Sequence, residues 1–123
     1  MYEISVEQEF DAAHALRGYQ GKCEALHGHR FRVAVTIRAS QLNEIGLAYD
    51  FTVLKKQLGE IVGRFDHTSL NDVPPFDKLN PSSENIAFTV FNEMKSKLGG
   101  APVTLSRVEV WESPTSRAEY RPD

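Results

Sequence analysis

The stretch that decides the fold is H-R-F-R-V-A-V-T-I-R-A, residues 29–39. Four apolar side chains share one face of it: Phe31, Val33, Val35 and Ile37. Successive side chains of an extended chain point to opposite faces, so this alternation is typical of a half-buried strand in an antiparallel sheet. Residues 2–10 alternate in the same way. The sequence therefore predicts two such strands, joined by an ordered connection over residues 11–28.

Two helices are predicted next along the chain. Apolar residues recur at helical spacing over residues 51–65, and Asp50 or Thr52 supplies an N-cap. A second stretch with helical spacing begins at Ser82 or Ser83 and ends before a Gly-Gly pair, which commonly stops a helix. Both helices have one apolar stripe, which must pack against another element.

Two further strands are predicted over residues 103–112 and 117–121. The order strand, strand, helix, helix, strand, strand indicates an α+β fold, in which an antiparallel four-stranded sheet carries both helices on one face. The 123 residues suffice for one domain with one hydrophobic core, spanning 1–123. Open sheet edges must be protected or paired, so association of several chains into a closed barrel is an expectation.

Composition excludes several classes of function. The chain has 14 Lys and Arg against 17 Asp and Glu, a formal net charge of −3, so it lacks the basic surface of a nucleic-acid-binding protein. No apolar run approaches the roughly 20 residues that span a bilayer, so no membrane partner is expected. The single cysteine fits the reducing cytoplasm, which we expect as the location.

Three histidines are candidate metal ligands. His27 and His29 flank a glycine at the start of a strand, and side chains two residues apart in a strand point to the same side. His14 follows the first strand and lies near the same sheet end if the two strands pair. Three imidazoles suit a zinc ion and leave its fourth position open for water or substrate. The alternative is three ordinary surface or hydrogen-bonded histidines.

Four other residues are candidates for chemistry, each with an ordinary alternative. Cys23 could be a fourth zinc ligand, a reactive thiolate or an inert buried residue. Asp66 and His67 could form a proton-transfer pair, or a simple helix end. Glu112 ends a strand on its apolar face, where it could accept two parallel N–H donors from a ligand or lie in solvent.

Six motifs together resemble the 6-pyruvoyl-tetrahydropterin synthase family, and within it the bacterial 6-carboxytetrahydropterin synthases of queuosine biosynthesis. The motifs are F-D-A-A-H (10–14), C-E-A-L-H-G-H (23–29), D-F-T-V-L-K (50–55), F-D-H-T-S-L-N (65–71), P-S-S-E-N-I-A (81–87) and W-E-S-P (111–114). They occur in the family's order and cover nearly the whole chain. Each motif alone is weak, but the set is specific.

The resemblance implies a role for each candidate residue. It gives zinc ligands His14, His27 and His29, catalytic residues Cys23, Asp66 and His67, and substrate-binding residues Glu112, Ser82 and Ser83. It implies the tunnelling fold, in which subunit sheets join into a barrel, as a trimer or hexamer with active sites at subunit interfaces. Candidates for the triphosphate contacts are Lys22, Lys55, Arg17, Lys78 and Arg117.

The implied reaction is a zinc-dependent lyase reaction on 7,8-dihydroneopterin triphosphate. In the bacterial branch its products are 6-carboxy-5,6,7,8-tetrahydropterin, acetaldehyde and triphosphate. Three residues separate Cys23 from His27, as in that branch. The alternatives are a 6-pyruvoyltetrahydropterin synthase, a folate-type side-chain lyase on the same substrate, and a non-catalytic pterin- or zinc-binding protein.

Overall fold

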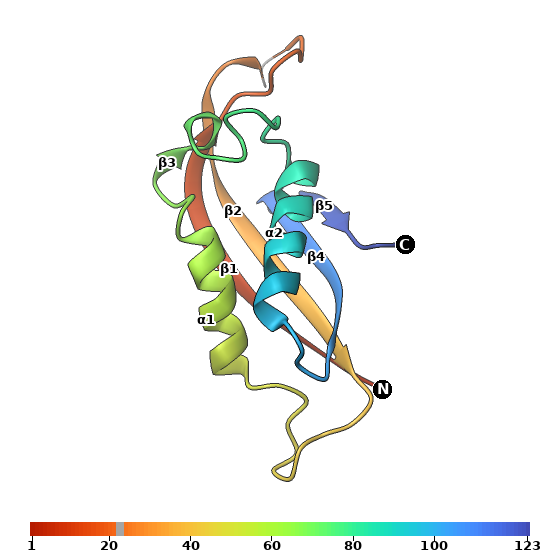
Figure 1. Ribbon diagram of the computed structural model, residues 1–123. Helices are drawn as coiled ribbons and strands as arrows, with labels where there is room; N and C mark the ends of the chain where they lie inside the picture. Colours follow the sequence, from red (N-terminus) through yellow and green to blue (C-terminus); the bar gives the residue numbers. More distant parts are fainter. Residues whose placement is uncertain (22–23) are drawn as a thin grey trace.

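A computed structural model describes residues 1–21 and 24–123, and over these residues the chain forms a five-stranded sheet with two α-helices on one face (Figure 1). The strand order in the sheet is β3-β1-β2-β4-β5. The elements are β1 (Tyr2–His14), β2 (His27–Ala39), α1 (Phe51–Val62), β3 (Thr68–Ser69), a 3-10 turn (Leu70–Asp72), α2 (Ser83–Leu98), β4 (Thr104–Ser113) and β5 (Ser116–Tyr120).

The predicted α+β class is confirmed, but the predicted count of four strands is wrong. The additional strand, β3, has two residues and runs parallel to β1, with Thr68 opposite Ala12. Alternation cannot reveal a strand of two residues, because one repeat of the pattern already needs that length. The short strand covers part of the β1 edge.

The pairing of β1 with β2 continues further than the predicted strands. It extends through residues 11–14 and 27–28, so that His14 lies opposite His27 and Ala12 lies opposite His29. These positions are rich in Ala and Gly, which blurs the alternation while the backbone ladder continues. Both ends of the predicted connection are therefore strand, and the histidines lie on a regular sheet.

The core lies between the sheet and the two helices. The stacked rings of Phe10 and Phe31, with centroids 4.9 Å apart, connect β1 to β2 beneath the helices. The Asp50 carboxylate caps α1 by accepting a hydrogen bond from the Thr52 N–H at 2.8 Å. The Ser82 side chain caps α2 by accepting a hydrogen bond from the Asn85 N–H. The first turn of α2 lies at the histidine end of the sheet (Figure 1). The first helix ends at Val62, three residues earlier than expected.

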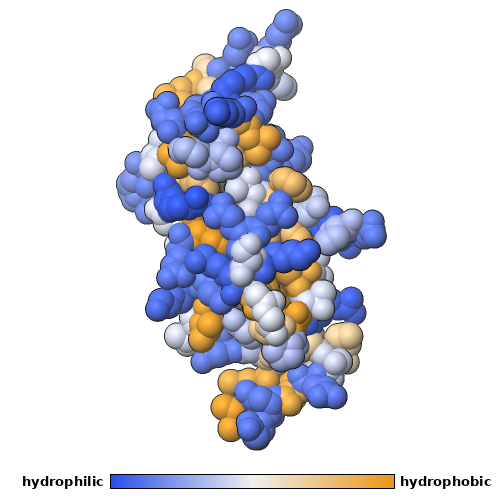
Figure 2. Space-filling view, viewed as in Figure 1, coloured by the Kyte–Doolittle hydropathy of each residue, from blue (hydrophilic) through white to orange (hydrophobic). Residues whose placement is uncertain are grey.

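The helix-covered side of the molecule has a largely hydrophilic surface (Figure 2). Smaller hydrophobic patches are scattered over it, and one of them lies at the end that holds the loop between β2 and α1, where Leu42, Ile45 and Leu47 are exposed. Among the residues that the structure describes, no helix has the length and apolar character needed to cross a bilayer.

Candidate metal centre and active site

Three histidines converge at one end of the sheet. His14 is the last residue of β1, and His27 and His29 open β2. Residues paired across two antiparallel strands point to the same face, so the register places all three rings on the helix-covered side. One ligating nitrogen from each ring lies within 4.8 Å of those of the other two. This spacing suits three nitrogens around one metal ion.

In the rings of His14 and His27, a hydrogen bond to a backbone carbonyl determines which ring nitrogen is free to bind a metal ion. His14 Nδ1 lies 2.7 Å from the carbonyl oxygen of Pro81, and His27 Nδ1 lies 2.8 Å from that of Ala25. A carbonyl oxygen only accepts, so each Nδ1 carries the proton and each Nε2 keeps its lone pair. This arrangement of a metal-binding histidine with a carbonyl partner is the usual one in zinc sites.

The surroundings of the His14 Nε2 atom indicate that these residues are suited to bind a metal ion. It is buried and has no hydrogen-bond partner among the described residues. A buried polar atom without a partner is costly, and a metal ion is one group that would satisfy it. Burial is the main cause that lowers the pKa of His14 below its ordinary value of 6.5, and the neighbouring His27 and His29 lower it further. The Pro81 carbonyl and Glu112 act in the opposite direction and raise this pKa, but the net shift is downward. The ring is therefore held neutral, as a metal ligand must be.

Glu112 and Ser83 lie beside the histidines. The Glu112 carboxylate oxygen Oε2 is 3.9 Å from His14 Nε2 and 3.8 Å from His29 Nε2. The Ser83 hydroxyl donates a hydrogen bond to the same oxygen at 3.4 Å. A cleft at this position is lined by His14 and by all three residues predicted to bind substrate, Ser82, Ser83 and Glu112. One chain thus places a candidate ligand cleft directly against the histidine cluster.

Asp66 and His67 form a second group of residues. His67 Nδ1 lies 3.0 Å from Asp66 Oδ2, while Asp66 Oδ1 accepts the backbone N–H of Asp11 at 2.9 Å. The backbone hydrogen bond from Asp11 is the main reason that the pKa of Asp66 is lowered, and His67 adds to it. His67 has a left-handed backbone conformation (φ 58°), and 78% of its side chain is exposed. The Asp66 carboxylate is therefore ionised and held by the Asp11 backbone, while the His67 imidazole is open to solvent.

The pair does not share a cleft with Glu112. His67 lines a shallow surface together with Asp11, Ala13 and Arg30 of the open sheet face, and also with His29 of the histidine cluster. The surface thus lies at the end of the β1–β2 ladder and reaches residues of both sheet faces. Cys23, the predicted catalytic thiolate, lies outside the described residues. Within the described part of one chain, the predicted catalytic and substrate-binding residues remain apart.

Comparisons with known proteins identify the family. The family described as 6-pyruvoyl tetrahydropterin synthase matches residues 3–123. The chain belongs to this family. The 6-carboxy-5,6,7,8-tetrahydropterin synthase of Synechocystis sp. is 40% identical over 125 residues, covering 98% of this chain and 93% of that protein. The Bacillus subtilis protein of the same name is 33% identical over 128 residues, covering 98% and 86%.

A solved structure gives the same result for the fold. The Caenorhabditis elegans 6-pyruvoyl tetrahydropterin synthase is similar with a TM-score of 0.85 at 28% identity, covering 100% of this chain and 98% of that chain. The predicted family and its tunnelling fold are therefore confirmed.

In this member of the family, polar tethers surround the histidine end of the sheet. The Asn71 amide exchanges two hydrogen bonds of 2.9 Å with the backbone of Ala15, and Asn80 pairs in the same way with the backbone of Arg17. The Arg17 guanidinium donates to the carbonyl of Phe76 at 2.6 Å, so this candidate for triphosphate binding is engaged in the loop. Sequence reasoning missed the tethers, although Asn71 ends a family motif.

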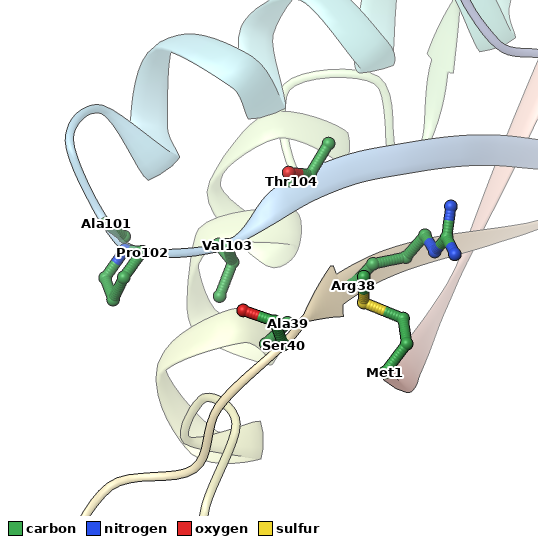
Figure 3. Close-up of a pocket in the computed structure, with 8 residues that line it drawn as sticks. All are labelled: Met1, Arg38, Ala39, Ser40, Ala101, Pro102, Val103 and Thr104. Atoms are coloured by element: carbon green, nitrogen blue, oxygen red, sulfur yellow. The ribbon is translucent and has the colours of Figure 1, made fainter.

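Another pocket lies at the opposite end of the sheet, between the N-terminus, the end of β2 and the start of β4 (Figure 3). Its lining is apolar or hydroxylic apart from the backbone and the Arg38 side chain. Arg107 and Arg117 form ion pairs with Glu109, and Arg117, a candidate for triphosphate binding, also lines the cleft beside Glu112. The histidine cluster and the cleft with Ser82, Ser83 and Glu112 thus lie at the end of the sheet opposite to this pocket.

Proposed function

We propose that the chain is a zinc-dependent lyase that converts 7,8-dihydroneopterin triphosphate to 6-carboxy-5,6,7,8-tetrahydropterin, acetaldehyde and triphosphate, for queuosine biosynthesis. The observation that carries the proposal is the cluster of His14, His27 and His29 beside Glu112, in a chain 40% identical to a protein named for this product. Residues 1–123 form a single domain in this proposal, and the protein acts in the cytoplasm.

In this proposal, zinc is held by the Nε2 atoms of the three histidines, two of which have Nδ1 committed to a carbonyl. When bound, the ion supplies Lewis acidity, which lowers the cost of removing a proton next to a coordinated oxygen. Glu112 accepts two N–H groups of the pterin ring, and the Ser83 hydroxyl orients its carboxylate. Ser82 contributes the N-terminal end of α2 to the same cleft.

Cys23 and His67 move the protons of the substrate side chain. Asp66 supports His67 by accepting its Nδ1–H, which leaves Nε2 free to take a proton. The lowered pKa of Asp66 keeps the supporting group charged while His67 works. The Asp66 carboxylate is itself held by the Asp11 backbone N–H, so the orientation of the pair is set by the end of β1.

The active site is completed by a neighbouring copy of the chain, in a trimer or hexamer. His67 is 78% exposed and does not line the cleft that holds Ser83 and Glu112. A second copy that presents its His67 to the cleft beside Glu112 would bring both groups to one substrate.

Mixing two inactive variants tests this arrangement. His27→Ala removes a zinc ligand, and His67→Ala removes the proton-transfer group. After subunit exchange, some interfaces combine an intact metal centre from one chain with an intact pair from the other, so we expect partial recovery of turnover. A mixture that stays inactive, although mass measurements show exchanged oligomers, would refute sharing between copies.

The second candidate is a 6-pyruvoyltetrahydropterin synthase, which the 28% identity to the Caenorhabditis elegans enzyme favours. The two functions differ in whether the pterin side chain is cut. Mass spectrometry of the pterin formed from 7,8-dihydroneopterin triphosphate by zinc-loaded protein separates them. We expect the carboxy product, and a pyruvoyl product would replace our proposal with the second candidate.

A further inference from the structure

Asn80 fastens the segment after His14 to the start of α2. Its side-chain oxygen accepts the Arg17 N–H at 2.9 Å, and its side-chain nitrogen donates to the Arg17 carbonyl at 3.2 Å. The amide thus pairs with both backbone groups of one residue, as a strand neighbour would. Arg17 lies three residues after His14, the last residue of β1, so these two hydrogen bonds fix Asn80 relative to the end of β1.

The backbone carbonyl of Asn80 is held from the other side. It accepts the Asn85 side-chain amide at 2.8 Å and the Ser82 N–H at 2.9 Å. The Ser82 N–H and the Pro81 carbonyl belong to one planar peptide group, so fixing the first orients the second. The Pro81 carbonyl is the group that His14 Nδ1 contacts at 2.7 Å. A continuous chain of hydrogen bonds therefore runs from Asn85 through Asn80 to the His14 ring.

We propose that Asn80 is a positioning residue for the metal ligand His14, and that it acts through the Pro81 carbonyl with the support of Asn85. The inference rests on the metal site of the proposed function. A fixed carbonyl keeps the proton on Nδ1 and aims Nε2 at the metal, and loss of such support typically weakens metal binding 10- to 100-fold. Asn80 acts through one intervening peptide, so we expect the lower end, about tenfold.

The test compares the full-length variants Asn80→Ala and Asn85→Ala with a matched control. Asn43 also uses its side chain to bind backbone, accepting the Ile45 and Leu47 N–H groups at 3.0 Å each, in the loop at the opposite end of the sheet. Zinc dissociation constants are measured by competition with a chromogenic chelator, and thermal unfolding of the metal-free chains is recorded alongside. We expect about tenfold weaker zinc binding in both site variants and an unchanged constant in Asn43→Ala.

The tautomer of His14 gives a second readout that needs no metal. In the metal-free wild type, nitrogen-detected NMR should show the proton of His14 on Nδ1, and in Asn80→Ala a mixture of both tautomers. Zinc constants within twofold of the wild type in Asn80→Ala and Asn85→Ala, with the Nδ1 tautomer kept, would overturn the positioning role. Wild-type protein that fails to bind zinc would instead refute the metal site itself.

Discussion

Burial of His14 makes the stability of the metal-free protein depend on pH. Its pKa is lowered in the folded chain, chiefly by burial, from an ordinary value of 6.5 that applies when the chain is unfolded. At a pH between the pKa of the folded chain and 6.5, the unfolded chain binds more protons than the folded chain. The free energy of unfolding therefore falls as the pH drops below 6.5. One proton accounts for a slope of at most about 1.4 kcal/mol per pH unit. The slope vanishes again below the folded pKa, where both states are protonated.

His14→Gln removes this titration. Denaturant unfolding of metal-free wild type and variant, between about pH 5 and about pH 8, gives both free energies at each pH. We expect the two curves to be parallel above pH 6.5 and to converge below it, because only the wild type loses stability through His14. Equal slopes in wild type and His14→Gln would refute the reasoning from burial.

Three substitutions separate packing, substrate binding and proton transfer. Phe31→Ala removes a fully buried ring that packs against His14 and His29. It should lower the free energy of unfolding, measured by denaturant titration, by about 3–5 kcal/mol. A loss below about 1 kcal/mol would contradict this packing. Glu112→Gln weakens hydrogen bonds to the charged carboxylate by about 1.5–3 kcal/mol, so kcat/KM should fall roughly ten- to hundredfold with unchanged zinc content. Zinc lost in parallel would make Glu112 a ligand. Cys23→Ala should keep zinc and lose turnover, as elemental analysis and product assays can check; a parallel loss of zinc would assign Cys23 to the metal.

The regular elements follow from local patterns in the sequence. The alternation at Phe31 to Ile37 gives β2 and its buried face, and the stripe that begins at Phe51 gives α1. The His-x-His pair and His14 meet because strand pairing brings the end of one strand to the start of the next. These features were predictable because each depends on a repeat or a register that neighbouring residues enforce.

Features that depend on single long-range contacts were not predictable in this way. No local pattern shows that Asn80 reaches Arg17, or that the Pro81 carbonyl supports His14. The short β3 depends on contacts with β1 that form only after the loop has folded back. The alternation of β1 assigns Asp11 to the open face, but only the folded structure shows that Asp66 and His67 gather beside it.

The most direct test of a zinc-dependent side-chain lyase is acetaldehyde release from 7,8-dihydroneopterin triphosphate before and after metal removal. We expect wild-type protein stripped with a chelator to release none, and re-addition of one zinc per chain to restore one acetaldehyde for each triphosphate. His27→Ala, treated identically, should stay inactive. Acetaldehyde released at the full rate by the stripped protein, or none released by protein with a filled zinc site, would contradict the proposed function.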